Sequence, residues 1–320
     1  MPLHRCRIAL LLGSLGSLSL AHATSLPMDW AEGSSVEYSA WWERNSRIAA
    51  QVPGLKGEQR GQVRISVIKR TPATHLLHWK PVLEGGTLAP DQPLEEPGVA
   101  IWRLPLALGL ELKLTADGSS ELVALNNRAA VAAQAADGVR ALTEKAGLTL
   151  DCGKQTDPAS ENLLCRLISS PQRIGEWVLR PVSPFFACTG LTLPEQARSE
   201  WLENHPDPRI GDAIRIRYVR ELPGFVPGKP TVQIRTVAEP DAQQLEAWMR
   251  EKLGGVPGVD NPVLESVSGL RFRIETDCTM DRATGWPLRV EQRSSVGTGT
   301  PYEGSETVRF ERTGYTPGKS

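Results

Sequence analysis

The residues of this 320-residue chain with reactive side chains are few. His75, His78 and His205 are the histidines beyond residue 23, and the segment around His75 and His78 is expected to be extended. Side chains three positions apart on a strand point to opposite faces, so this pair does not predict a metal site. No other pattern in the chain predicts a metal or a cofactor.

Motifs of nucleophilic or phosphate chemistry are also missing from the sequence. It contains no GxSxG elbow, no HExxH helix and no phosphate-binding loop. A triad assembled from distant residues would leave no such signature. The sequence therefore favours a non-enzymatic protein and keeps a hydrolase without a recognisable motif as an alternative.

Four cysteines follow residue 23, and their spacing favours disulfide bonds. There is no CxxC pair and no common zinc-binding spacing. An even number of cysteines in an exported chain allows three pairings. We favour Cys152–Cys165, which closes a local loop, and Cys188–Cys278, which connects a central loop to a late strand.

The first 23 residues predict export. Arg5 and Arg7 precede an apolar run at residues 8–20, and Ala21-His22-Ala23 has small residues at the positions that a signal peptidase reads. We expect cleavage before Thr24 and a soluble mature chain in the periplasm or outside the cell. No later apolar stretch is long enough for a transmembrane helix.

The charge of the chain argues against nucleic acid as a partner. The chain has 36 basic and 37 acidic residues, and removal of the signal leaves 34 against 37. Proteins that bind nucleic acid usually carry a basic excess.

Alternating apolar and polar residues predict antiparallel strands in the N-terminal and C-terminal thirds. The clearest examples are residues 62–69, 270–277, 288–292 and 307–312. Helices are expected after Asn126 or Asn127 up to about Lys145, and after Asp241. Two shorter helices are expected in the middle, one starting near Pro158 and one opened by Pro194 that carries Trp201 and Leu202.

The predicted fold class is therefore α+β, with mainly antiparallel sheets and a helical, disulfide-linked middle. The expected organisation is a cleaved signal at residues 1–23, a β-rich lobe at 24–147, a middle segment at 148–208 and a second β lobe at 209–320. Both β lobes are expected to include a helix.

Tryptophan provides the best indication of a contact surface. The chain has nine Trp but only five Phe and four Tyr. Trp41 and Trp42 are neighbours on a predicted strand, so one of them lies away from the core. Phe185 and Phe186 lie in an apolar loop that either plugs the core or borders a ligand pocket. These four residues are the candidate ligand or partner surface.

Arginines recur at outward-facing strand positions and allow two interpretations. The set is Arg215, Arg217, Arg271, Arg273, Arg289, Arg293 and Arg309. One interpretation is an anion-binding sheet. The other is a solvated face with cross-strand pairs to Glu275, Glu291 and Glu311, which the interleaved acids favour.

A turn in the last third carries a resemblance to a known group of proteins. Residues 279–287 read Thr-Met-Asp-Arg-Ala-Thr-Gly-Trp-Pro, which is similar to the Asp-x-x-Thr-Gly-x-Pro turn of exported half-barrel proteins. These include the outer-membrane lipoprotein carriers and uncharacterised periplasmic families. The resemblance implies a curved sheet around a helix, with a concave face that can hold an acyl chain. It transfers no functional residue.

Three functions follow as expectations. The first is an exported, non-enzymatic binding protein for an apolar or lipid-like ligand. The second is a protein-interaction module such as an inhibitor or immunity protein, and the third is the hydrolase already mentioned. The sequence identifies neither the ligand, the partner nor the oligomeric state.

Overall fold

The computed structural model describes most of the chain after residue 23. The described residues are 24–26, 28–47, 55–82, 108–117, 122–145, 152, 165, 168–179, 181–193, 198–206, 213–226, 228–254, 271–297 and 303–318. The expected signal at residues 1–23 and the helix expected near Pro158 lie outside this set.

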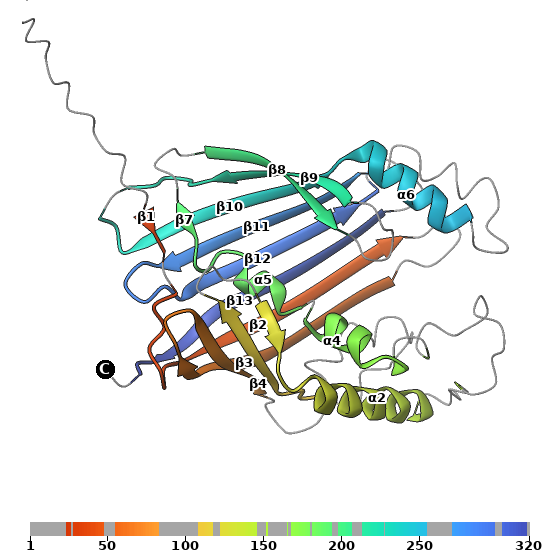
Figure 1. Cartoon of the computed structure of the whole chain (residues 1–320), viewed down its shortest axis with the longest axis horizontal. Helices are drawn as coiled ribbons and strands as arrows, with labels where there is room; N and C mark the ends of the chain where they lie inside the picture. The colour runs from red at the N-terminus through yellow and green to blue at the C-terminus, as the bar shows by residue number, and fades with distance from the viewer. Residues whose placement is uncertain are drawn as a thin grey trace, which may run out of the picture.

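A single antiparallel sheet of eleven strands forms the scaffold (Figure 1). Its order is β6-β5-β4-β3-β2-β13-β12-β11-β10-β9-β8, so strands from both ends of the chain meet in its centre. The strands are β2 (Ser35–Arg47), β3 (Leu55–Arg70), β4 (Thr74–Val82), β5 (Leu112–Asp117), β6 (Leu122–Leu125), β8 (Arg198–Pro206), β9 (Ala213–Glu221), β10 (Thr231–Pro240), β11 (Phe272–Asp281), β12 (Pro287–Val296) and β13 (Glu303–Thr316). A separate two-stranded sheet pairs β1 (Thr24–Ser25) with β7 (Thr192–Leu193).

The alternation of each strand gives the sheet two chemically different faces. We call the face that bears Tyr38, Cys278 and Phe310 the inner face, and the opposite face the outer face. Helices α4 (Pro171–Leu179) and α5 (Ser183–Phe186) lie in front of the inner face in Figure 1. Cys188, just after α5, is bonded to Cys278 of β11, so a disulfide ties this cover to the sheet.

Aromatic side chains fill the inner face beneath α5. Phe185 of α5 makes edge-on contacts with Tyr38, Trp79 and Phe310, with ring centroids 5.1, 5.7 and 5.8 Å apart. Trp30 stacks on Trp286 at 3.7 Å. All of these rings are at most 3% exposed, so this part of the inner face is a packed core.

Helix α2 (Arg128–Lys145) starts and ends where the sequence predicts, and it packs against α4. Asn127 stands at the expected cap position, since its backbone carbonyl accepts a hydrogen bond from the amide of Val131 at 3.0 Å. Its side-chain oxygen accepts a hydrogen bond from the backbone amide of Lys113 at 2.9 Å, so it also fixes the helix start to β5. Asp241 does cap α6 (Ala242–Gly254), since its carboxylate accepts bonds from the amides of Gln243 and Gln244 at 3.0 Å each.

The α+β class with a dominant antiparallel sheet is confirmed. The helix expected after Pro194 is wrong, because Trp201 and Leu202 lie in strand β8 at the edge of the sheet. The resemblance implied curved lobes. The structure instead shows an open sheet that continues through residues of both expected lobes. The division into separate lobes stays a prediction.

Within the described residues, no helix is long and apolar enough to cross a membrane.

Candidate functional site

The adjacent tryptophans of β2 lie on opposite faces, as predicted. Trp42 packs edge-on against Phe310 of the inner face, with ring centroids 5.7 Å apart. Trp41 lies on the outer face, where its indole N–H donates to Glu58 at 2.8 Å and Arg309 lies over its ring at 5.0 Å. Trp41 is thus the tryptophan that faces away from the core, and its role as a contact surface stays a prediction.

Phe185 and Phe186 form the last part of α5 and are buried, with 0% and 3% exposure. Their rings contact each other at 5.2 Å. The structure therefore places these two residues in the core, apart from Trp41 on the outer face. Because both side chains are buried, a ligand in solvent does not reach them in this structure.

The cysteines form the two predicted bonds, Cys152–Cys165 and Cys188–Cys278. The second has a sequence separation of 90 residues and joins the cover of the inner face to its strand.

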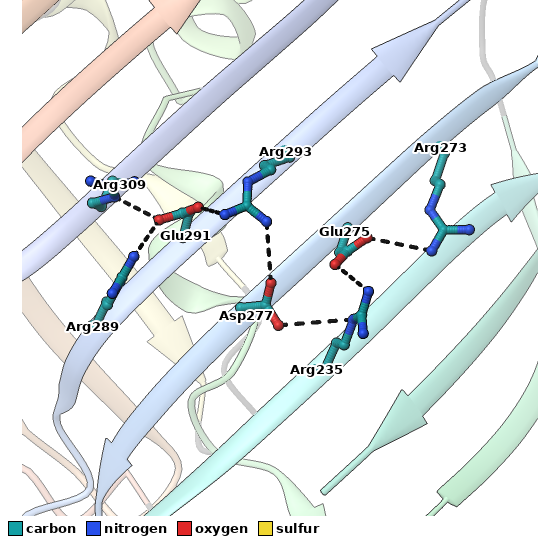
Figure 2. Close-up of polar contacts among 8 residues, drawn as sticks. All are labelled: Arg235, Arg273, Glu275, Asp277, Arg289, Glu291, Arg293 and Arg309. Carbon is teal, nitrogen blue, oxygen red and sulfur yellow. Dashed lines mark hydrogen bonds and ion pairs between the residues drawn. The ribbon is translucent and has the colours of Figure 1, made fainter. Parts of the chain in front are cut away.

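The outer face carries a continuous network of ion pairs (Figure 2). Glu291 of β12 accepts bonds from Arg289 at 2.7 Å, from Arg309 at 2.6 Å and from Arg293. Across β11 and β10, Asp277 lies 3.8 Å from Arg293 and 4.0 Å from Arg235. Arg235 also pairs with Glu275, and Arg273 binds both Glu275 and Glu239 of β10.

The charges of this network perturb one another. Burial raises the pKa of Glu291, but the hydrogen bonds from Arg289 and Arg309 outweigh it and hold the pKa below its ordinary value. Burial and the neighbouring Glu275 raise the pKa of Asp277. Every arginine drawn in Figure 2 has a carboxylate partner, so the outer face behaves as the ion-paired sheet that the interleaved acids predicted.

The inner face of the edge strands β8 and β9 presents a different arrangement. Trp201 of β8 and Tyr218 of β9 are directly opposite each other in the ladder, and their rings stack at 5.1 Å with an interplanar angle of 9°. Arg220, opposite Ser199, places its guanidinium over the Trp201 ring at 4.9 Å. All three side chains are partly exposed, in contrast to the closed aromatic core under α5.

Arg220 has no carboxylate partner among the described residues. Its side-chain Nε–H donates to the hydroxyl of Thr236 at 3.4 Å. Burial without a compensating acid lowers the pKa of Arg220. The inner-face acid Glu203 lies further along β8, opposite Ile216, where its charge adds to the effect of burial in raising the pKa of Tyr218.

The register of the strands sorts the inner face near Arg220 into two parallel rows. One row crosses the strands through Arg220, Thr236, Thr276 and Gln292, and is polar. The Gln292 amide donates to Thr276 at 3.1 Å. The adjacent row passes through Trp201, Tyr218, Ala238 and Ile274, and is mainly apolar. The two rows together form an amphipathic surface.

Two histidines, His75 and His78, lie on β4. His75 is buried at the start of β4, and neither ring nitrogen has a partner there. His78 lies on the opposite face of β4 and contacts Glu111 at 3.1 Å. The described residues include no group of three or more His, Cys, Asp or Glu that could hold a metal ion.

Sequence reasoning missed the site formed by Trp201, Tyr218 and Arg220. One signal was visible, because Arg220 interrupts the apolar side of β9 set by Ile214, Ile216 and Tyr218. The nearby Pro194 made a helix start the more obvious interpretation.

The fold and this surface define an α+β protein built on one large antiparallel sheet, with a packed core on one part of its inner face and an open aromatic edge on another. No family model matches the chain. No curated protein matches it either.

A solved structure of lipovitellin, described as "lipid-protein interactions in lipovitellin", is similar to the chain with a TM-score of 0.43 and 10% sequence identity. The match covers 91% of this chain and 26% of the lipovitellin chain, so this chain spans about a quarter of that protein's length.

Proposed function

We propose that this chain is an exported, non-enzymatic binding protein that holds an apolar ligand on the inner face of strands β8–β11. The observation that carries the proposal is the stacked, partly exposed pair Trp201 and Tyr218. Binding is favourable when a ligand removes large, partly exposed aromatic surfaces from water.

The rest of the inner face supports this location. Beneath α5 the rings of Phe185, Tyr38 and Phe310 bury one another completely, so this part of the sheet is filled by the chain's own side chains. The row beyond Tyr218 continues with Ala238 and the partly exposed Ile274, which extends the apolar surface across three strands.

Export is supported by chemistry of the chain itself. Two disulfides are typical of proteins that fold in an oxidising compartment. The pattern of residues 1–23, with a basic start, an apolar run and small residues at the expected cleavage point, supports the same assignment.

The outer face offers less to a protein partner than its tryptophan content indicated. Trp41 is already engaged by Glu58 and Arg309, and the neighbouring arginines are paired. A partner would have to replace these contacts with its own, so the interaction module is the weaker hypothesis.

Binding of glycerol monolaurate, an uncharged amphiphile, tests the proposal. The titration is followed by native mass spectrometry below the concentration at which the probe aggregates. We expect a one-to-one adduct, and we expect the double variant Trp201→Ala/Tyr218→Ala to bind about 10-fold more weakly because most of the aromatic contact is lost.

Leu202→Ala is the matched control for this experiment. Leu202 is adjacent to Trp201 on the same strand, is 64% exposed and points to the opposite face. It should leave the affinity unchanged. Absence of an adduct with the wild-type chain, or equal losses in the control and the double variant, would contradict the proposal.

A further inference from the structure

We propose that the ligand is an anionic amphiphile, whose headgroup pairs with Arg220 and whose apolar chain lies along Trp201 and Tyr218. This inference rests on the proposed function and names the chemical class of its ligand.

The two faces of strand β9 differ in whether their arginine pairs with a carboxylate. Arg217, on the outer face, donates to Glu200 at 2.7 and 3.1 Å and lies 3.7 Å from Glu239. Arg220, three residues further on, points to the inner face and pairs with no carboxylate of the described residues. A partly buried guanidinium without an acidic partner is stabilised when an anion from outside the chain pairs with it.

The Arg220 guanidinium has N–H donors beyond the one that bonds to Thr236. A guanidinium has five N–H donors, and the bond to Thr236 uses the one on Nε. The guanidinium carbon lies over the Trp201 ring at 4.9 Å, and no described residue forms an ion pair with the remaining N–H groups. The pairs of N–H groups at the edge of a guanidinium match the two oxygens of a carboxylate or the oxygens of a phosphate.

The strand register places Arg220 at the border between polar and apolar side chains of the inner face. Arg220 lies in the polar row between Ser199 and Thr236, and this row borders the apolar row of Tyr218, Ala238 and Ile274. A ligand with its charge at Arg220 and its chain across the apolar row would match both rows at once. An uncharged apolar ligand would leave Arg220 without a partner.

The shared chemistry is a singly or doubly charged acid on an apolar chain, and such a headgroup is either a carboxylate or a phosphate. Titrations with laurate, monododecyl phosphate and glycerol monolaurate distinguish these sources, since the three probes have the same chain length. We expect at least one of the two anions to bind about 10-fold more tightly than glycerol monolaurate, and the tighter one identifies the headgroup. Added salt should lower the affinity for the anion but not the affinity for the uncharged probe.

Arg220→Gln tests the residue, and Arg217→Gln on the outer face of the same strand is its matched control. Arg220→Gln should remove the preference for the anion, about a 10-fold loss, while leaving the affinity for glycerol monolaurate unchanged. Arg217→Gln should change neither affinity. Arg220→Lys keeps the charge and should retain part of the preference.

Three results would overturn the inference. They are equal affinities of the wild-type chain for all three probes, an anion affinity that Arg220→Gln does not change, and an equal loss of both probe types in that variant. If glycerol monolaurate still binds, the proposed function survives and only the anionic headgroup is rejected. If no probe binds the wild-type chain, both proposals fail.

Discussion

Trp30 stacks on Trp286 with ring centroids 3.7 Å apart and an interplanar angle of 3°. Trp30 lies in the segment before β2, and Trp286 lies in the turn between β11 and β12, so this contact joins distant parts of the chain. Both rings are completely buried. The turn that carried the sequence resemblance therefore has a structural role, because it places Trp286 in the core.

Trp286→Ala should lower the free energy of unfolding by about 3–5 kcal/mol, because it removes a buried ring and leaves a cavity beside Trp30. Chemical denaturation followed by circular dichroism measures the change. Leu202→Ala, on a side chain that is 64% exposed, should change it by less than about 0.5 kcal/mol. Similar losses for the two variants would show that the stacked pair does not anchor the core.

The two disulfides should contribute unequally to stability. Cys188–Cys278 has a sequence separation of 90 residues and Cys152–Cys165 one of 13. The chain-entropy model gives about 4–5 kcal/mol for the long loop and about 3 kcal/mol for the short one. Thermal unfolding of the two double Cys→Ala variants should show the larger loss for Cys188 and Cys278. The reverse order would mean that the bond from Cys188, just after α5, to Cys278 of β11 adds little to the packing of these elements.

His75 should make stability depend on pH. Burial lowers its pKa, the charge of Arg70 lowers it further, and Asp29 acts in the opposite direction. The unfolded chain therefore takes up a proton near pH 6.5 that the folded chain resists, and stability falls as the pH drops below about 6.5 toward the folded pKa.

Denaturant midpoints of the wild-type chain and His75→Phe, measured between pH 8 and pH 5, check this dependence. The ring contact with Trp30 at 6.0 Å is retained by a phenyl group, whereas the titrating nitrogens are removed. The wild-type chain should lose stability relative to the variant as the pH falls. Parallel pH profiles would contradict the prediction.

Glu291 should be a stabilising carboxylate even though it lies on a charged face. Its side chain is 2% exposed and accepts bonds from three arginines. Glu291→Gln should lower the free energy of unfolding by about 1–3 kcal/mol, because the arginines lose the negative charge and one of its two acceptor oxygens, and the new amide NH2 group faces their donors. Urea titrations at low and high salt measure this.

Glu200→Gln is the comparison for Glu291, since its side chain is 46% exposed and pairs with Arg217 in open solvent. Its effect should be smaller and more strongly reduced by salt. Because the pKa of Glu291 is lowered in the folded chain, its contribution should persist at neutral pH and disappear as the pH falls through that folded pKa. A larger effect at Glu200 would contradict the assignment.

Local patterns predicted much of this fold. The alternation around Val308 and Phe310 identified β13 and its buried face, and the Asn126-Asn127 pair marked the start of α2 at Arg128. These features depend on neighbours within a few residues, which is the range over which periodicity and capping act. The disulfide pairing was also correct, since one bond is local and the other follows from the remaining two cysteines.

Long-range arrangements could not be predicted in the same way. The pairing of β13 with β2 has no local signal, because nothing near Phe310 or Ala40 specifies the other. The candidate site depends on such pairing as well. Trp201 meets Tyr218 only because β8 and β9 lie side by side, and Arg220 lacks an acidic partner because the residues opposite it in the ladder are Ser199 and Thr236.

The central position of the β2–β13 pair has a consequence for how the chain is made. Strand β2 begins at Ser35 and its neighbour β13 ends at Thr316, so the sheet is divided into two sets of five strands until β13 has been synthesised. Until then β2 and β12 each have an unpaired edge, which is the kind of edge that recruits other chains. A chain that ends before residue 303 would therefore leave the edges of β2 and β12 unpaired. The fourteen-residue strand β13 covers both edges and joins the two parts into one sheet.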